Sequence, residues 1–158
     1  QRWSSAVEAF RKAIAMRPGY VEAYNNLGLV LHRSGSSGDA VAMLRKAIEL
    51  EPSYAQAYFN LGTIYMEKAR YDEAVANYHE ATRLQPDFVQ AYYNMGQAEY
   101  CRGRLNAAIN CYRKAVQINP KHYGAWHNLG IAYRDKGLTD KAVEALEKAV
   151  ALNPNLMR

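Results

Sequence analysis

The pentapeptide Tyr58–Gly62, YFNLG, returns in three further versions, each 34 residues from the next: YNNLG at 24–28, YYNMG at 92–96 and WHNLG at 126–130. Each version contains an aromatic residue, a variable residue, an Asn, a Leu or Met, and a Gly. Glycine inside a helix costs about 1 kcal/mol relative to alanine, and Asn is a mediocre helix former. Their regular return therefore indicates a requirement of packing or of recognition at these two positions.

The same period of 34 residues runs through the whole chain. Within one period the spacing of apolar residues predicts two helices, at about 55–68 and 71–84, and a proline ends the second. Short connections favour antiparallel packing of neighbouring helices. The residues that mark the period are the prolines Pro18, Pro52, Pro86, Pro120 and Pro154 and the alanines Ala6, Ala40, Ala74, Ala108 and Ala142.

The turn between the two helices of a pair carries a glycine in three of the four full periods, at Gly35, Gly103 and Gly137. Glycine suits the left-handed backbone that closes many helices. Ala69 takes this place in the remaining period.

These features resemble the tetratricopeptide repeat family. Residues 126–133, WHNLGIAY, fit the pattern W-x-x-L-G-x-x-Y at every specified position, and residues 58–65 fit it with Tyr for Trp. The resemblance implies an all-α fold, a right-handed superhelical solenoid of antiparallel helix pairs with about nine helices. It divides the chain into the second helix of an incomplete repeat at 1–20 and four full repeats at 21–54, 55–88, 89–122 and 123–156, all in one solenoid domain.

The recurring glycines have a packing interpretation. Small residues at a fixed helical position let two helix backbones approach closely. We expect Gly28, Gly62, Gly96 and Gly130 to face the alanines Ala40, Ala74, Ala108 and Ala142 of the partner helices.

The Asn positions have a different interpretation. Each Asn comes one residue before the Leu or Met that faces the partner helix, and one residue turns a helix by about 100°, so the Asn side chains should point elsewhere. The resemblance implies that the first helix of each repeat lines a concave face, where the Asn residues would form a ladder. An amide offers two donors and an acceptor, which can hold the main chain of an extended peptide. Alternatively, each Asn bonds a backbone group of the neighbouring repeat, and both roles stay open.

Helical spacing places further side chains beside the Asn column, at positions one before it, three after it, six after it and near the start of the helix. These places hold amides and aromatic residues without a cluster of Lys and Arg. The predicted peptide-binding residues are Asn26, Asn60, Asn94, Asn128, Phe59, Tyr93, His127, Gln56, Gln90, Met66, Gln97 and Tyr100.

The sequence therefore predicts a scaffold that binds an extended peptide segment of a partner protein in its concave groove. The alternative is the substrate-recruiting arm of a larger enzyme, because the unbroken Asn column is similar to the repeat arm of O-linked N-acetylglucosamine transferases. We find no combination of residues that predicts catalysis, a metal site or a cofactor. The net charge of +5 is spread along the chain, which argues against nucleic-acid binding.

Location and self-association can also be addressed from the residues. No apolar run approaches the roughly 18 residues of a membrane-spanning helix, so we expect no membrane association. Cys101 and Cys111 are interpreted as free thiols in a reducing compartment, which favours a cytoplasmic location. The terminal repeats carry no polar caps, so we expect end-to-end self-association through Phe10 at one end and Leu146 and Val150 at the other.

Glu99 departs from the pattern, because equivalent places hold Tyr65 and Tyr133. A carboxylate at a helix–helix contact is costly unless it is paired. Either it reaches solvent near the edge of the contact, or Tyr100 beside it rotates into the contact, or Arg102 or Arg104 pairs with it.

Overall fold

The computed structural model describes residues 2–154, and this range holds nine α-helices. They confirm the predicted all-α fold and the expected number of helices. The predicted helices at 55–68 and 71–84 appear as α4 and α5, within one residue at each end. The helices are α1 (Arg2–Met16), α2 (Val21–Arg33), α3 (Ser37–Leu50), α4 (Ala55–Glu67), α5 (Tyr71–Leu84), α6 (Val89–Cys101), α7 (Leu105–Ile118), α8 (Tyr123–Asp135) and α9 (Thr139–Leu152).

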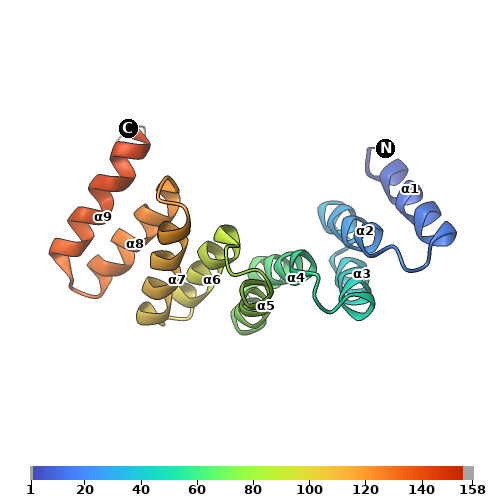
Figure 1. The fold of residues 1–158 in the computed structure, drawn as a ribbon, viewed down its shortest axis with the longest axis horizontal. Coiled ribbons are helices and arrows are strands. Elements are labelled where there is room, and N and C mark those ends of the chain that lie inside the picture. The colour runs from blue at the N-terminus through green and yellow to red at the C-terminus, as the bar shows by residue number, and fades with distance from the viewer. Residues whose placement is uncertain (1, 155–158) are drawn as a thin grey trace. The chain divides into compact units, whose positions relative to one another are not determined.

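The chain divides into two compact units, Gln1–Gln85 and Pro86–Arg158. In the first unit α2 packs against α3 and α4 against α5, while α1 packs against α2. In the second unit α6 packs against α7 and α8 against α9. The two helices of each pair are antiparallel and joined by a tight turn (Figure 1). The division into repeats of one solenoid domain stays a prediction.

The turns inside the pairs adopt the predicted left-handed backbone. The φ angles are +90° at Gly35, +73° at Gly103 and +77° at Gly137. Ala69 has φ +55°, the one positive φ angle of a non-glycine residue within residues 2–154. The following N–H, of Arg70, donates to the Tyr65 carbonyl at 2.9 Å and so satisfies a carbonyl that the end of the helix leaves without a partner.

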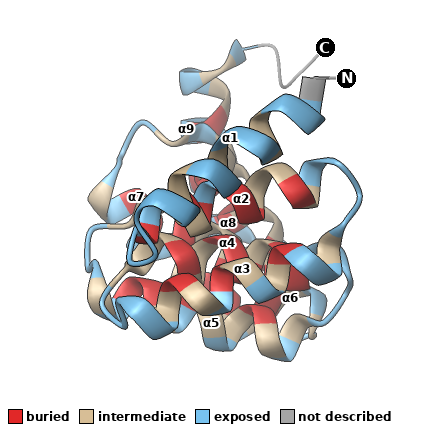
Figure 2. Cartoon of the chain, turned by 90° about the vertical axis from the view of Figure 1, so that its right-hand side faces the viewer, coloured by how far each residue is buried: buried red, intermediate tan, exposed pale blue. Residues whose placement is uncertain are grey.

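Small and large apolar residues alternate in the core of each unit. In the first unit Ala40, Leu44, Ala74 and Tyr78 are fully enclosed. In the second unit Tyr112 lies in a cluster with other buried residues of α7, α8 and α9. In Figure 2 buried segments lie on the helix faces that meet other helices, and exposed segments lie on the outer faces and turns.

The glycine column confirms close helix packing, with one difference. A Cβ atom at Gly62 would lie 2.8 Å from the Tyr78 ring and 3.3 Å from the Ala74 carbonyl oxygen, and one at Gly96 would lie 2.6 Å from the Tyr112 ring. The tightest neighbour is therefore the large residue one turn after the expected alanine. Helical side chains lean toward the N-terminus of their own helix, so the tyrosine reaches back over the alanine onto the glycine.

Candidate functional site

The Asn-bearing helices of the first unit, α2 and α4, are linked by a chain of side-chain amides. Gln56 Nε2 donates to Asn60 Oδ1 at 3.1 Å, and Asn60 Nδ2 donates to Asn25 Oδ1 at 2.8 Å. Asn25 Nδ2 in turn donates to Asn26 Oδ1 at 3.2 Å. The side-chain amides thus donate in one direction, from α4 to α2, and the hydrogen bonds of such a series strengthen one another.

The members of this amide chain differ in exposure. Asn60 and Asn25 are 5% and 2% exposed, whereas Asn26 is exposed to solvent. Asn60 therefore stabilises the contact between α4 and α2. This is close to the alternative role foreseen for the column, except that its partner is a side chain of the preceding pair rather than a backbone group. The Nδ2 group of Asn26 has no partner within the described residues.

The second unit repeats this arrangement with different chemistry. Tyr93 stands two periods after Asn25 and accepts hydrogen bonds from Asn128 Nδ2 at 3.2 Å and Gln97 Nε2 at 3.4 Å. Gln90 Nε2 donates to Asn94 Oδ1 at 2.9 Å. Partial burial raises the pKa of Tyr93, and the hydrogen bond from Asn128 opposes that rise. The Tyr93 hydroxyl therefore stays protonated at neutral pH.

A second polar contact lies two turns further along the same helices. His32 Nε2 and Glu67 of the first unit are 2.8 Å apart, and Tyr100 donates to Asp135 in the second unit. This hydrogen bond raises the pKa of Tyr100 and lowers that of Asp135.

All four contacts join residues 35 positions apart: Asn25 with Asn60, His32 with Glu67, Tyr93 with Asn128, and Tyr100 with Asp135. In these contacts, a residue of one Asn-bearing helix meets the residue 35 positions later, which is one more than the period of 34.

The predicted aromatic residues lie partly against the second helices of their pairs. The Phe59 ring centroid is 5.8 Å from that of Tyr78, and the Tyr93 centroid is 6.1 Å from that of Tyr112. His127 contacts Asn128 at 3.3 Å between Nδ1 and Oδ1. Met66, like these residues, is neither fully buried nor fully exposed. Each can offer one edge to a ligand while the rest of the side chain is fixed by packing.

Glu99 is buried and paired. It is 8% exposed, and its Oε2 accepts from Arg102 Nη1 at 3.0 Å. Of the alternatives, the structure therefore shows the ion pair rather than an extension to the edge. Tyr100, which stands beside it, is bonded instead to Asp135.

The two cysteines differ in their exposure to solvent. Cys101 is exposed, whereas burial raises the pKa of the Cys111 thiol to about 12. Within residues 2–154, no group of three or more His, Cys, Asp or Glu side chains is placed to hold a metal ion. The helices described for this chain do not combine the length and apolar character needed to cross a membrane.

Sequence models of the tetratricopeptide repeat family match almost the entire chain. Models described as tetratricopeptide repeat match residues 1–55, 43–76 and 123–156, and one described as TPR repeat matches residues 62–101 and 96–137. Among curated protein sequences no significant match is found.

Solved structures of MamA proteins share the fold. Two described as crystal structures of MamA are 29% identical to this chain, with TM-scores of 0.89 and 0.86. The first match covers 98% of this chain and 91% of that structure, and the second 97% and 84%. MamA from Desulfovibrio magneticus RS-1, residue 41 to its end, is 22% identical with a TM-score of 0.86, covering 97% and 86%. These likenesses confirm the predicted solenoid class of fold.

Proposed function

This chain belongs to the tetratricopeptide repeat family, and from that premise we propose that it holds an extended peptide segment of a partner protein on its Asn-bearing helices. The family and the related structures support the broader statement that the chain is a protein-interaction scaffold. Each unit offers such a surface by itself, the Asn-bearing faces of α2 and α4 in the first unit and those of α6 and α8 in the second.

The observation that carries the proposal is the amide chain that ends at exposed Asn26. Asn25 and Asn60 are held in place by burial and by their hydrogen bonds, so the Asn26 side chain is positioned before a ligand arrives. Its Nδ2 group can donate to a main-chain carbonyl without a change in the network. Ordering a side chain on binding costs about 0.5–1.5 kcal/mol, and this preorganisation reduces that cost.

In the second unit the equivalent surface offers both amides and an aromatic edge. Gln90 is exposed, and Asn94 and Tyr93 are partly exposed. Asn94 Oδ1 accepts from Gln90, which fixes the orientation of its amide. Peptides with a regularly bonded main chain and a few apolar side chains suit such a surface.

The test begins with peptides selected from a random displayed library on the full chain. We expect the Asn26→Ala/Asn94→Ala variant to bind a selected peptide about tenfold more weakly, since each lost hydrogen bond contributes about 0.5–1.5 kcal/mol. The matched control is Gln85→Ala/Asn106→Ala, which removes two exposed polar side chains elsewhere. Equal affinities of the two double variants would contradict the proposal.

The alternative interpretation, an arm of an O-linked N-acetylglucosamine transferase-like enzyme, is not favoured by the MamA structures described above. The proposed function involves no catalytic step. The cytoplasmic location stays a prediction.

End-to-end self-association is also a proposal, supported by apolar residues that remain exposed on α1 and α9. Trp3 is 41% exposed and Val143 is 50% exposed, whereas the three predicted residues, Phe10, Leu146 and Val150, are only partly exposed. Light scattering over a range of concentrations tests it. A mass that rises with concentration is expected, and a constant monomer mass at millimolar concentration would contradict it.

A further inference from the structure

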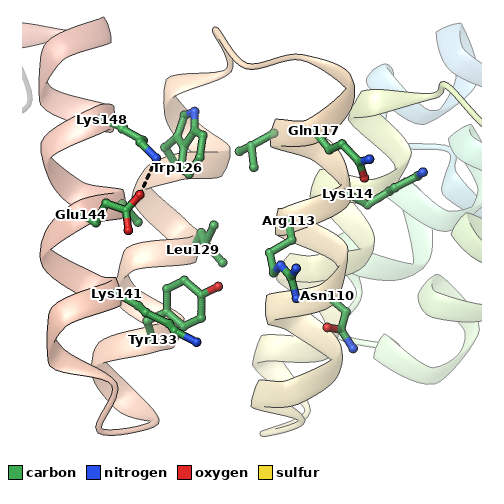
Figure 3. A pocket seen from close by; sticks show the side chains of 12 residues that line it. Asn110, Arg113, Lys114, Gln117, Trp126, Leu129, Tyr133, Lys141, Glu144 and Lys148 are labelled. Carbon is green, nitrogen blue, oxygen red and sulfur yellow. Dashed lines mark hydrogen bonds and ion pairs between the residues drawn. The ribbon is translucent and has the colours of Figure 1, made fainter.

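A hollow of about 720 Å³ lies in the second unit, between α7, α8 and α9. Its floor is apolar, with Val116, Leu129 and Ala145 buried beneath it. Its lining includes none of the residues predicted from the Asn column, so it is a separate surface. Figure 3 shows the side chains of α7 and α9 on its two sides and Trp126 of α8 between them.

The rim of this hollow is strongly basic. Arg113 and Lys114 of α7 and Lys141 and Lys148 of α9 line it, with Glu144 as the one carboxylate of the lining. Lys148 is already bonded to Glu144 at 2.6 Å. Arg113, Lys114 and Lys141 are exposed and have no ion-pair partner within the described part of the chain. Three cations therefore face solvent around an apolar floor without a compensating charge.

Trp126 is held in a fixed orientation at one end of the hollow. Its indole Nε1 donates to the Pro120 carbonyl at 2.9 Å, and Lys148 Nζ lies 4.6 Å from its ring centroid. A fixed, partly exposed indole offers apolar contact area at little entropic cost. Tryptophan and arginine are also the residue types that most often dominate binding energy at protein interfaces.

The first unit contains the equivalent hollow, and it differs in charge and depth. Three periods before Arg113, Lys141 and Ala145 stand Arg11, Asp39 and Met43, which line a smaller hollow of about 370 Å³ between α1, α2 and α3. There a carboxylate replaces one cation, and a larger side chain replaces the alanine of the floor. The larger volume and the more basic lining therefore distinguish the α7–α8–α9 hollow from the α1–α2–α3 hollow.

We propose that the α7–α8–α9 hollow binds an acidic peptide segment of a partner protein, with an apolar side chain of that segment on the floor beside Trp126. Its carboxylates pair with Arg113 on one side and Lys141 on the other. Arginine can bind a carboxylate through two parallel hydrogen bonds. This site would let the scaffold hold a second protein segment in addition to the one proposed for the Asn-bearing helices.

The test uses a labelled synthetic peptide with acidic residues around a central Leu-Phe pair, titrated onto the full chain at low salt. Arg113→Glu/Lys141→Glu should weaken binding at least about tenfold, because charge complementarity becomes repulsion. The matched control, Arg11→Glu/Lys12→Glu, makes the same change of net charge at exposed positions on α1 and should change affinity less than twofold. Equal losses would mean that the peptide senses only overall charge, which would overturn the proposal.

A second variant tests the floor without altering charge. Ala145→Met copies the residue that the first unit already accommodates at Met43, and we expect it to abolish most of the affinity while the helical spectrum is retained. An acidic peptide in which Gly replaces the Leu-Phe pair should bind at least fivefold more weakly. Equal binding of both peptides, or preferential binding of a short single-stranded DNA in competition, would overturn the assignment to an acidic peptide with an apolar anchor.

Discussion

Asn60 donates its side-chain amide to Asn25 Oδ1 at 2.8 Å, across the contact between α4 and α2. Both residues are buried, so this hydrogen bond is shielded from water. Asn residues therefore stabilise the contact between α2 and α4 in the first unit. We propose that another Asn of the same unit binds the peptide. The two roles are divided between residues of one column, because Asn60 is buried and Asn26 is exposed.

The first prediction concerns this division. Asn60→Ala leaves Asn25 Oδ1 without its donor and Gln56 without its acceptor, so the free energy of unfolding should fall by about 2 kcal/mol. Asn26→Ala removes only the acceptor of the longer, 3.2 Å hydrogen bond from Asn25 Nδ2 at the exposed end of the network, and it should lower the free energy of unfolding by less, about 0.5–1 kcal/mol. Urea denaturation measures the free energy of unfolding of both variants. Equal losses would contradict a larger contribution of the buried hydrogen bond between Asn60 and Asn25.

The second prediction concerns helix contact. Gly62→Ala should destabilise the chain by about 1–3 kcal/mol, because the new Cβ would lie 2.8 Å from the buried Tyr78 ring and overpacking outweighs the gain in helix propensity. Gly38→Ala is the control, since nothing lies within 4 Å of its Cβ position, and it should be neutral or stabilising. Thermal unfolding separates the two cases. A stabilising Gly62→Ala would refute the packing explanation of the glycine column.

The third prediction concerns the turn at Ala69, whose φ is +55°. A left-handed backbone costs an L-residue about 1–2 kcal/mol, and glycine avoids most of that cost. Ala69→Gly should therefore stabilise the chain by about 0.5–1 kcal/mol, although glycine usually destabilises. Gly103→Ala, at the equivalent turn, should destabilise it by about 1 kcal/mol. Opposite signs in chemical denaturation are expected, and a loss of stability in Ala69→Gly would disprove the assignment of strain.

The fourth prediction concerns the two thiols. Burial raises the pKa of Cys111 to about 12 from an ordinary value of 9.0, so its thiolate is scarce in the folded state at neutral pH. A thiol-reactive disulfide reagent should label exposed Cys101 quickly and Cys111 only after denaturant is added. Cys101→Ser is the control and should remove the fast phase. Rapid labelling of both thiols in the native protein would contradict the burial of Cys111.

The same shift sets a pH dependence. The folded pKa lies above the unfolded one, so the stabilisation from the buried neutral thiol is complete below pH 9 and is lost as the pH rises toward about 12. The difference in stability between the wild type and Cys111→Ala should shrink over that interval.

The repeat architecture could be predicted from the sequence because it depends on local rules. Prolines every 34 residues and glycines at the turns act through backbone conformation, and apolar spacing acts through helical periodicity. Ala69 was placed correctly for the same reason. These features do not require knowledge of how one helix is rotated against another.

The hydrogen-bonded pairs could not be predicted, because they depend on that rotation. Asn25 is absent from the predicted peptide-binding residues, and Tyr100 was expected in the peptide site rather than bonded to Asp135. Knowing that equivalent helices meet 35 residues apart would have identified both pairs. The basic hollow could not be predicted, because it is formed only when three helices pack together. Ala145 lines it where Met43 lines the smaller hollow of the first unit, and the sequence does not show that these two residues line hollows.

The central claim is that the Asn-bearing helices hold the main chain of a partner peptide. The most direct measurement is the affinity of the library-selected peptide with its backbone amides replaced by esters one at a time, since an ester carbonyl is a weaker hydrogen-bond acceptor and every side chain stays in place. The account predicts that replacement at a few regularly spaced positions weakens binding about fivefold or more, as expected for a lost hydrogen bond, and that these losses disappear in Asn26→Ala/Asn94→Ala. Affinity that is unchanged by ester replacement at every position would contradict recognition of the main chain.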